Sequence, residues 1–215
     1  MNIQKNRMKF LLFLFLPLIY PKAEELNLKK FLEEKNVFTN SNLRYLEKEN
    51  KIIVDMNVET ADTATEKKQK MNGYIAGLHE KSCDESSAIL AQYEKYKDYI
   101  SYVEKSEYRD GKAYMTISAR PLIESTFSLD IKVDRLKGVG KYPYLMGAGI
   151  FLNLGGIVEL LDYTDSVTKK KRCLYFVDSN WLGKYVGPNI LVQTFMTTIA
   201  RKGLERLFIV SGHHF

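Results

Sequence analysis

The chain has 215 residues, of which 45% are hydrophobic, 27% charged and 12% aromatic. This length and composition are typical of one globular domain with a sizeable core, and they exclude a disordered chain, a collagen and a disulfide-dense miniprotein. The 32 lysine and arginine residues exceed the 26 acids, but four of these bases lie in residues 1–23, which contain no acid. The other 28 bases nearly balance the acids. The net charge therefore predicts no nucleic-acid partner.

Residues 1–23 have the layout of a secretion signal peptide. Basic residues occupy positions 5, 7 and 9, and an apolar run follows over residues 10–20. The run is about 11 residues long, whereas a bilayer span needs about 20. We therefore expect a cleaved export signal and a periplasmic or secreted body. An uncleaved N-terminal anchor is the alternative, because Pro21 is unfavourable three residues before the expected cut.

Cys83 and Cys173 are the two cysteines of the chain. In an oxidising compartment they form a disulfide if the fold brings their Cα atoms within about 6 Å. The alternative is two separate buried thiols that act as small apolar residues. The sequence leaves both alternatives open.

The first part of the body changes from a helical pattern to a strand pattern. Residues 24–50 are charged with loosely spaced leucines, which predicts a helical N-terminal extension. From residue 51 the apolar residues alternate with polar ones, which predicts a half-buried strand over 51–59 and a second strand over 71–80. The polar residues 60–70 are expected to connect these two strands.

Short helices and a hairpin are predicted next. Ser82 is typical of a helix N-cap with acids in the first turn, and tyrosines at helical spacing continue the pattern. Asp110 and Gly111 are typical of a hairpin turn. The alternating residues 113–119 then predict a strand, which Pro121 ends.

Further strands are predicted along the second half of the chain. Residues 127–133 alternate without exception, whereas residues 138–146 are expected to form a loop. Strand material follows over 150–163. A polar, basic turn over 165–171 leads to the last predicted strand at 172–181.

A long C-terminal helix is predicted over residues 187–210, followed by a tail at 211–215. His79 is expected at the surface of the second strand, and His213 and His214 are expected to be solvated in the tail. These three histidines could bind a metal ion only if the tail folded back onto His79. We therefore predict no metal site and no cofactor.

The familiar catalytic motifs are absent from the sequence. There is no Gly-x-Ser-x-Gly, His-Glu-x-x-His, P-loop lysine or Cys-x-x-Cys motif. Asp178 is a weak catalytic candidate, because it lies in an aromatic strand between Phe176 and Asn180, where burial would raise its pKa. An outward-facing surface position is the simpler interpretation, so no catalytic residue is assigned.

A basic cluster occupies the turn before the last predicted strand. It consists of Lys169, Lys170, Lys171 and Arg172. Such charges favour a transient contact with an anionic membrane, at about 1 kcal/mol each. A solvated turn is the simpler interpretation.

Three groups of strings occur in a recognisable order over residues 71–210. They are SCDESSAIL at 82–90 with the following YEKY and VEKS, FLNLGGIVEL at 151–160 with LYF at 174–176, and the closing segment 183–210. In this order they resemble the START-like (SRPBCC), helix-grip superfamily, which includes polyketide cyclase-like and coenzyme-Q-binding proteins. The charged N-terminal segment and the strand at 51–59 depart from the family pattern.

The resemblance implies an α+β helix-grip domain over residues 51–210. In this fold a curved antiparallel sheet wraps around the long C-terminal helix, and two short helices follow the first strands. An elongated, mostly apolar space between sheet and helix is then expected to bind a ligand, although the same side chains could simply fill a core. The candidate ligand-binding residues are Met115, Ile117, Leu129, Ile131, Val133, Tyr175, Val177, Trp181, Phe195 and Ile199.

The sequence supports three functions. The first is an exported protein that binds or carries a hydrophobic small molecule, such as a lipid or an isoprenoid. The second is an envelope protein that acts through its surface and has a filled core. The third is a cyclase- or hydrolase-like enzyme that uses Asp178 or a cavity tyrosine on an apolar substrate. We favour the first, because an export signal and a cavity without a catalytic motif agree with it.

Overall fold

The computed structural model describes residues 26–62, 66–118 and 126–215. Within these residues the chain forms one antiparallel sheet of eight strands, five α-helices and one 3₁₀ helix. The predicted signal peptide, Ala119 and Pro121 lie outside the described residues. In chain order the elements are α1 (Leu28–Glu34), α2 (Asn40–Glu47), β1 (Ile53–Asp62), β2 (Lys67–His79), α3 (Cys83–Leu90), η1 (Tyr93–Lys95), α4 (Tyr96–Tyr99), β3 (Val103–Arg109), β4 (Lys112–Ser118), β5 (Thr126–Val133), β6 (Gly140–Met146), β7 (Gly155–Thr164), β8 (Lys171–Lys184) and α5 (Asn189–Val210).

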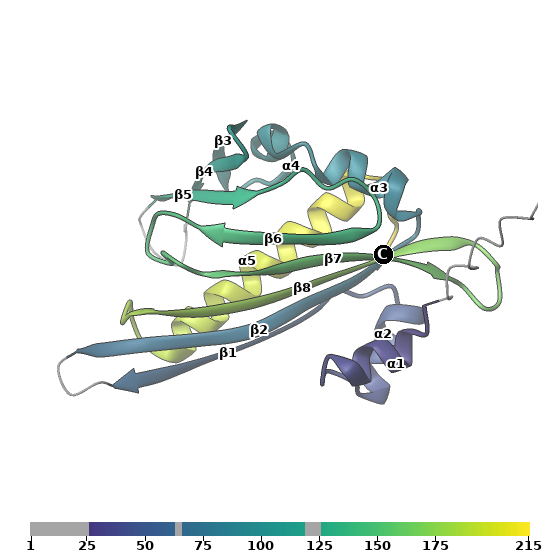
Figure 1. Ribbon diagram of the computed structural model, residues 1–215, viewed down its shortest axis with the longest axis horizontal. Helices are drawn as coiled ribbons and strands as arrows, with labels where there is room; N and C mark the ends of the chain where they lie inside the picture. The colour runs from purple at the N-terminus through teal and green to yellow at the C-terminus, as the bar shows by residue number, and fades with distance from the viewer. Residues whose placement is uncertain (1–25, 63–65, 119–125) are drawn as a thin grey trace, which may run out of the picture.

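The sheet curves around α5, which runs diagonally across the strands (Figure 1). The strand order is β1-β2-β8-β7-β6-β5-β4-β3, and each neighbouring pair is antiparallel. The short helices α3, η1 and α4 lie in the connection from β2 to β3, which is the strand at the far edge of the sheet. The prediction of an α+β helix-grip fold, with short helices after the first strands, is confirmed.

Two local signals in the sequence are confirmed by the backbone. Ser82 caps α3 and forms a reciprocal capping box with Glu85. Asp110 and Gly111 have φ values of 51° and 71°. Positive φ at both central residues is what a type I′ hairpin turn requires, so this pair sets the turn between β3 and β4.

The predicted loop over residues 138–146 is wrong, because most of it forms β6 in the interior of the sheet. Tyr142, Tyr144 and Met146 pack against the core, and the residues between them are exposed. The alternation is present in the sequence. Pro143 nevertheless led to the prediction of a loop, because proline is uncommon in central strands.

β1 and β2 are longer than predicted, so the expected connection over residues 60–70 is also wrong. The two strands stay paired as far as Asp62 and Lys67. This part of β2 still pairs with β8 as far as Lys68 and Lys184, but its residues are mostly polar, so no apolar alternation marks it in the sequence. β7 is shorter than expected, because residues 150–154 form a turn and β7 begins only at Gly155.

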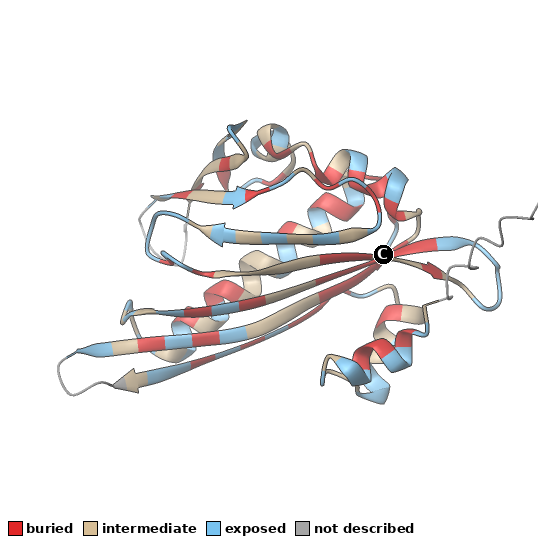
Figure 2. Ribbon diagram, viewed as in Figure 1, coloured by how far each residue is buried: buried red, intermediate tan, exposed pale blue. Residues whose placement is uncertain are grey.

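Most of the core lies between the sheet and α5 (Figure 2). One cluster joins the strands to the C-terminal half of α5, where Phe208 meets Tyr175 edge-on with ring centroids 5.2 Å apart. A second cluster surrounds the N-terminal half of α5, where Phe195 and Met196 pack with Trp181. Burial of these aromatic side chains holds α5 against the sheet at both ends.

The opposite face of the sheet carries a second core beneath α1 and α2. Leu32 of α1 and Leu46 of α2 are fully buried there. Phe31 meets Phe176 of β8 edge-on, with ring centroids 5.3 Å apart. The N-terminal helices therefore cover the face of the sheet that is turned away from α5.

Cys83 and Cys173 form a disulfide, with their Cα atoms 4.6 Å apart. Both residues are fully buried. The bond joins the start of α3 to β8 across a sequence separation of 90 residues. Of the two alternatives left open by the sequence, pairing is the one found.

Candidate functional site

An apolar pocket opens at the N-terminal end of α5, and we name it the helix-start pocket. Its volume is about 290 Å³. It lies where α5, the start of β5, the β6–β7 turn and the β8–α5 connection meet. The lining residues are Phe127, Ile150, Phe151, Val186, Gly187, Pro188, Leu191, Val192, Thr194 and Phe195.

Aromatic contacts hold the walls of this pocket in place. Phe127 of β5 meets Phe195 of α5 edge-on, with ring centroids 5.6 Å apart. Phe151 of the β6–β7 turn meets Trp181 in the same way at 5.3 Å. The Trp181 Nε1–H also donates a hydrogen bond of 3.0 Å to the carbonyl of Leu152. These contacts anchor the turn over the sheet, so the pocket has fixed walls on both sides.

The rim of the helix-start pocket exposes large apolar side chains. Ile150 and Leu191 line the pocket but are 44% and 63% exposed. Apolar side chains that gather at the mouth of an apolar pocket are typical of a site that binds a hydrophobic ligand or surface.

The candidate ligand-binding residues on the strands all lie on the face toward α5. In an antiparallel sheet, directly paired residues share a face. Met115 pairs with Leu129, and Ile117 pairs with Phe127, whose ring touches Phe195. The inward strand faces are thus placed as the alternation predicts.

The candidate residues are nevertheless spread over separate parts of the fold. Phe195 lines the helix-start pocket, whereas Met115 and Leu129 line a surface hollow of about 570 Å³ beside β3 and β4. Tyr175 lies in the packed core, where its hydroxyl is 2.8 Å from Ser86 Oγ and donates to it. As ligand contacts, the ten candidate residues stay predictions.

Asp178 lies on the outer face of the sheet, away from α5. It is directly opposite Tyr74 in the β2–β8 pair, and the Tyr74 hydroxyl accepts a 2.9 Å hydrogen bond from Asn42 of α2. The Asp178 carboxylate accepts a 2.6 Å hydrogen bond from the backbone N–H of Ile157. The enzyme hypothesis requires an ionisable group that faces the space under α5, and Asp178 does not meet this requirement.

Tyrosine hydroxyls do reach that space, but their hydrogen bonds are structural. The Tyr144 hydroxyl donates to the Asp178 carbonyl at 3.0 Å and lies 2.7 Å from Ser179 Oγ. Burial raises the pKa of Tyr144 to about 12, and burial also raises the pKa of Tyr175. Both hydroxyls are neutral at physiological pH, so neither supplies a general base.

His79 and His213 are buried side by side, with ring centroids 5.2 Å apart. The chain after α5 folds back, so that His79 Nε2 lies 2.8 Å from Ser211 Oγ and the Glu80 N–H donates to His213 Nδ1 at 3.2 Å. The predictions of a surface His79 and a solvated His213 are therefore wrong, whereas His214 is exposed as expected. In the described part of the chain, no three His, Cys, Asp or Glu side chains are placed to hold a metal ion.

The basic turn before β8 exposes three lysines rather than four basic residues. Arg172 is buried, and its guanidinium donates to the Asn50 side-chain oxygen at 2.7 Å and to the Leu78 carbonyl at 3.0 Å. The cluster from which a membrane contact was predicted is thus smaller than expected. None of the helices in the described ranges is long and apolar enough to cross a membrane.

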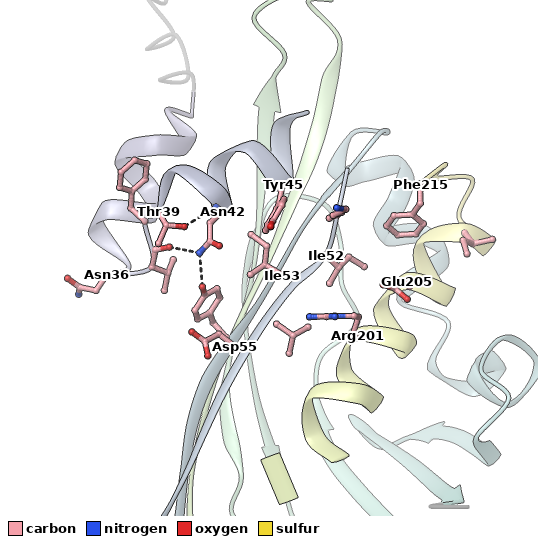
Figure 3. Close-up of a pocket in the computed structure, with 16 residues that line it drawn as sticks. Asn36, Thr39, Asn42, Tyr45, Ile52, Ile53, Asp55, Arg201, Glu205 and Phe215 are labelled. Atoms are coloured by element: carbon pink, nitrogen blue, oxygen red, sulfur yellow. Dashed lines mark hydrogen bonds between the residues drawn. The ribbon is translucent and has the colours of Figure 1, made fainter. Parts of the chain in front are cut away.

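A larger hollow, which we name the β1-edge hollow, lies beside β1 and has a volume of about 1010 Å³ (Figure 3). Its walls come from the α1–α2 region on one side of β1 and from the C-terminal part of α5 on the other. Charged side chains of Lys51, Asp55, Arg201 and Glu205 line it. For an apolar ligand, the smaller helix-start pocket is therefore the better match.

Most residues of the helix-start pocket are absent from the candidates that the sequence predicts. Ile150 and Phe151 lie in a turn that was expected to be a strand, and Leu191 and Val192 lie in the predicted C-terminal helix but were not among the candidate ligand-binding residues. One signal could have found them. In both segments bulky apolar residues lie close to glycine or proline. Turns are usually polar, so such residues indicate a packing or binding role.

No protein-family model and no curated protein matches this sequence. Solved structures do match it. A START superfamily protein from Mycobacterium smegmatis matches with a TM-score of 0.52 and 10% identity, over 65% of this chain and 96% of that one. A conserved protein from Geobacillus kaustophilus matches with a TM-score of 0.50 and 16% identity, over 66% of this chain and 97% of that one. The Zhui aromatase/cyclase from a Streptomyces species has a TM-score of 0.49 and 12% identity, over 66% and 93% of the two chains.

The first two matches cover nearly the whole of the other chain and about two thirds of this one. At such low identity they bear on the fold alone. In this chain the antiparallel sheet, the short helices after the first strands and the long closing helix are the features expected of a helix-grip fold. The chain therefore has the START-like, helix-grip fold.

Proposed function

We propose that this protein binds a hydrophobic small molecule, such as a lipid chain or an isoprenoid, in the helix-start pocket. The apolar lining of that pocket is the observation that carries the proposal. Thr194 supplies a hydroxyl to a lining that is otherwise apolar, and no charged side chain takes part. A ligand with a polar head would keep that head outside, beyond the rim.

The volume of the pocket limits the ligand. Pockets for drug-sized molecules have volumes of about 300 to 1000 Å³. At about 290 Å³ the helix-start pocket lies at the lower end of this range. It suits a small ring system or the end of an acyl or prenyl chain, with the rest of the molecule lying against Ile150 and Leu191 at the rim.

We also propose that the protein is exported, as the layout of residues 1–23 predicts. The buried disulfide between Cys83 and Cys173 supports this, because disulfides persist mainly in oxidising compartments. The mass of the protein recovered from its host tests the proposal. Loss of the N-terminal segment and of the two thiol hydrogens is expected. A full-length chain with reduced cysteines, recovered from the cytoplasm, would contradict export.

Two neighbouring residues give a matched test of ligand binding. Leu191 lines the pocket and Ile190 does not, yet both side chains are more than half exposed. Leu191→Trp puts an indole at the mouth of the pocket, and Ile190→Trp adds the same bulk beside it. We expect L191W to weaken binding of the apolar fluorophore 1-N-phenylnaphthylamine at least about tenfold, a loss of about 1.4 kcal/mol.

Ile190→Trp should leave the affinity for the fluorophore within about twofold of the wild type, because the added ring lies outside the lining. Circular dichroism would verify that both variants fold. Equal weakening in the two variants, or a wild type that does not bind the fluorophore, would contradict the proposed site.

A further inference from the structure

The outer edge of β1 is long, regular and unpaired. β1 and β3 are the two ends of the strand order, and no strand in the described part of the chain pairs with the outer edge of β1. β1 keeps an unbroken register with β2 over all 10 of its residues. Its sequence contains no proline, glycine or lysine. Such an edge presents a row of N–H and C=O groups that another strand can satisfy.

The opposite edge of the same sheet is protected. The β3–β4 register shifts between Val103 and Lys105. The segment that contains η1 and α4 lies against β3, because Ser106 Oγ donates to the Glu94 carbonyl at 2.8 Å and accepts from the Lys97 N–H at 3.0 Å. An irregular register, a lysine and a covering segment are common devices against edge pairing. Of the two edges of the sheet, the β1 edge is therefore the one that is open to another strand.

The β1-edge hollow lies at the start of this edge and is not confined to one face of the sheet. It touches residues 52–55 in succession, and successive strand residues point to opposite faces. Figure 3 shows Thr39 and Asn42 on one side of β1, and Arg201 and Glu205 on the other. A chain added to β1 would therefore place alternate side chains in the two halves of the hollow.

The two halves differ in the side chains that they would accept. On the α5 side, Arg201 and Glu205 line the hollow together with Ile209 and Phe215, which are 47% and 53% exposed. The exposed Ile209 and Phe215 give this half an apolar surface that apolar side chains can cover. On the other side, Asp55, Asn57 and Glu59 form an exposed row along β1. Opposite charges in directly facing positions stabilise a strand pair. The outer row therefore suits lysine or arginine.

We propose that the free edge of β1 receives an extended segment of another protein, in which basic residues alternate with apolar ones. The segment adds a strand to the sheet. Its apolar side chains cover Ile209 and Phe215, and its basic side chains face Asp55 and Glu59. This mode of recognition, strand addition, takes affinity from the backbone and specificity from alternate side chains.

A second copy of this chain is a poorer occupant. Antiparallel pairing of two β1 edges around Asn57 would set Asp55 of one copy opposite Glu59 of the other, and like charges in facing positions destabilise a strand pair. The pairing inside the molecule shows the favourable arrangement, because Lys70 of β2 lies directly opposite Glu59. A basic partner strand repeats that arrangement on the outer side of β1.

The probe for this site is an acetylated, amidated and fluorescently labelled peptide of alternating lysine and valine. A peptide of the same composition in a Lys-Lys-Val-Val pattern is the control, because it cannot present one basic and one apolar face as a strand. Fluorescence anisotropy should show that the alternating peptide binds at least about tenfold more tightly than the control. Hydrogen exchange of the β1 amides should slow when the alternating peptide is present.

The protein variants separate this edge from general charge attraction. The double variant D55K/E59K should weaken binding of the alternating peptide about tenfold, since both facing charge pairs become repulsive. The double variant E104K/E107K makes the same charge change at exposed positions on the β3 edge and should leave binding unchanged. All four residues are exposed, so both variants should fold.

Several results would overturn the proposal. These are equal binding of the two peptides, equal loss in the two double variants, or no binding to the wild type. A wild-type dimer that D55K/E59K disrupts in analytical ultracentrifugation would overturn it in favour of a second copy. Failure of the Leu191→Trp test would leave this proposal unaffected, because the helix-start pocket lies at the other end of α5.

Discussion

His79 is held neutral by its hydrogen bonds as well as by its burial. The Lys81 N–H donates to Nδ1 at 3.0 Å, so that nitrogen carries a lone pair. Ser211 Oγ donates to the Leu207 carbonyl at 2.8 Å, which leaves the hydroxyl free to accept from Nε2–H. A second proton on the ring would displace the Lys81 N–H.

The stability of the protein should therefore depend on pH. Burial, together with nearby His213, lowers the pKa of His79 from 6.5 to about 4, and burial also lowers the pKa of His213. Between these values the unfolded chain binds a proton that the folded chain does not. The stabilisation is thus present above pH 6.5 and is lost as the pH falls. Through His79 alone, the free energy of unfolding should fall by about 2 kcal/mol between pH 7 and pH 5.

Urea unfolding at pH 7, 6 and 5 measures this change, and two leucine variants locate its source. His79→Leu should remove the part of the pH dependence that His79 contributes, whereas the contribution of the buried His213 should remain. The exposed His214, replaced by leucine, should leave the dependence as in the wild type. A His79→Leu variant with the same slope as the wild type would show that His79 is not responsible.

The burial of His79 and His213 could not be predicted from the sequence. The five residues after α5 are too few to show a hydrophobic period, and polar side chains in a short tail are usually solvated. His79 is buried because the chain after α5 folds back over the last residues of β2. That contact depends on the direction in which the chain leaves α5, which residue types alone do not reveal.

At the scale of elements, α1 and α2 should fold as one unit with the sheet. Leu32 is fully buried between α1 and the outer face of the sheet. Leu32→Ala should lower the free energy of unfolding by about 3 kcal/mol, through lost burial and the cavity that it leaves. Chemical unfolding should remain a single transition.

The exposed Lys30, on the side of α1 opposite to Leu32, provides the control. Lys30→Ala removes a 3.8 Å ion pair with Glu34, and an exposed pair of this kind contributes less than about 1 kcal/mol. If Leu32→Ala cost no more than Lys30→Ala, or produced a separate early transition, α1 and α2 would be an appendage that is not part of the cooperative fold.

Strand alternation predicted most of the sheet because a half-buried strand keeps its pattern without any knowledge of the fold. The segments 127–133 and 172–181 became β5 and β8 for this reason. β6 was missed because Pro143 and the nearby glycines signal a loop by local propensity. Its backbone tolerates them inside the sheet, so tertiary packing outweighs the local signal there.

The ends of the strands were also misplaced. β1 and β2 continue through the mostly polar residues 60–62 and 67–70, which stay paired but show no apolar alternation. In contrast, the strand expected from residue 150 begins only at Gly155, since the preceding apolar residues form a turn. Apolar character alone does not distinguish a buried strand from a turn that lines a pocket.

At the scale of the whole molecule, the disulfide joins elements that come together only in the finished fold. Cys83 and Cys173 are 90 residues apart. A cross-link that closes a loop of this length should contribute about 4 kcal/mol by restricting the unfolded chain. Replacing both cysteines by alanine should lower the free energy of unfolding by about this amount, as measured by guanidinium unfolding.

The same unfolding measurement with a reducing agent provides a check on the disulfide. Reductant should destabilise the wild type and leave the double alanine variant unchanged. A wild type that is equally stable with and without reductant, once loss of the bond is verified by mass, would contradict the prediction.

The position of the proposed ligand site also depends on the packing of the whole molecule. Alternation predicts which strand residues face α5, but it does not predict where the space between sheet and helix is filled. Near the C-terminal end of α5, Phe208, Tyr175 and Leu160 pack as a solid core. Near the N-terminal end, three segments far apart in the sequence, at Phe127, at residues 150–151 and at residues 186–195, leave the helix-start pocket open. That difference depends on side-chain volumes and sheet curvature together.

The central claim is that this START-like fold binds a hydrophobic molecule in the helix-start pocket. Native mass spectrometry of the protein recovered from an oxidising compartment, followed by release of anything bound, tests it most directly. We predict one apolar adduct per chain in the wild type and in Ile190→Trp, and its loss in Leu191→Trp. A wild type that carries no adduct and takes up neither a fatty acid nor an isoprenoid, or an adduct that persists in Leu191→Trp, would contradict the claim.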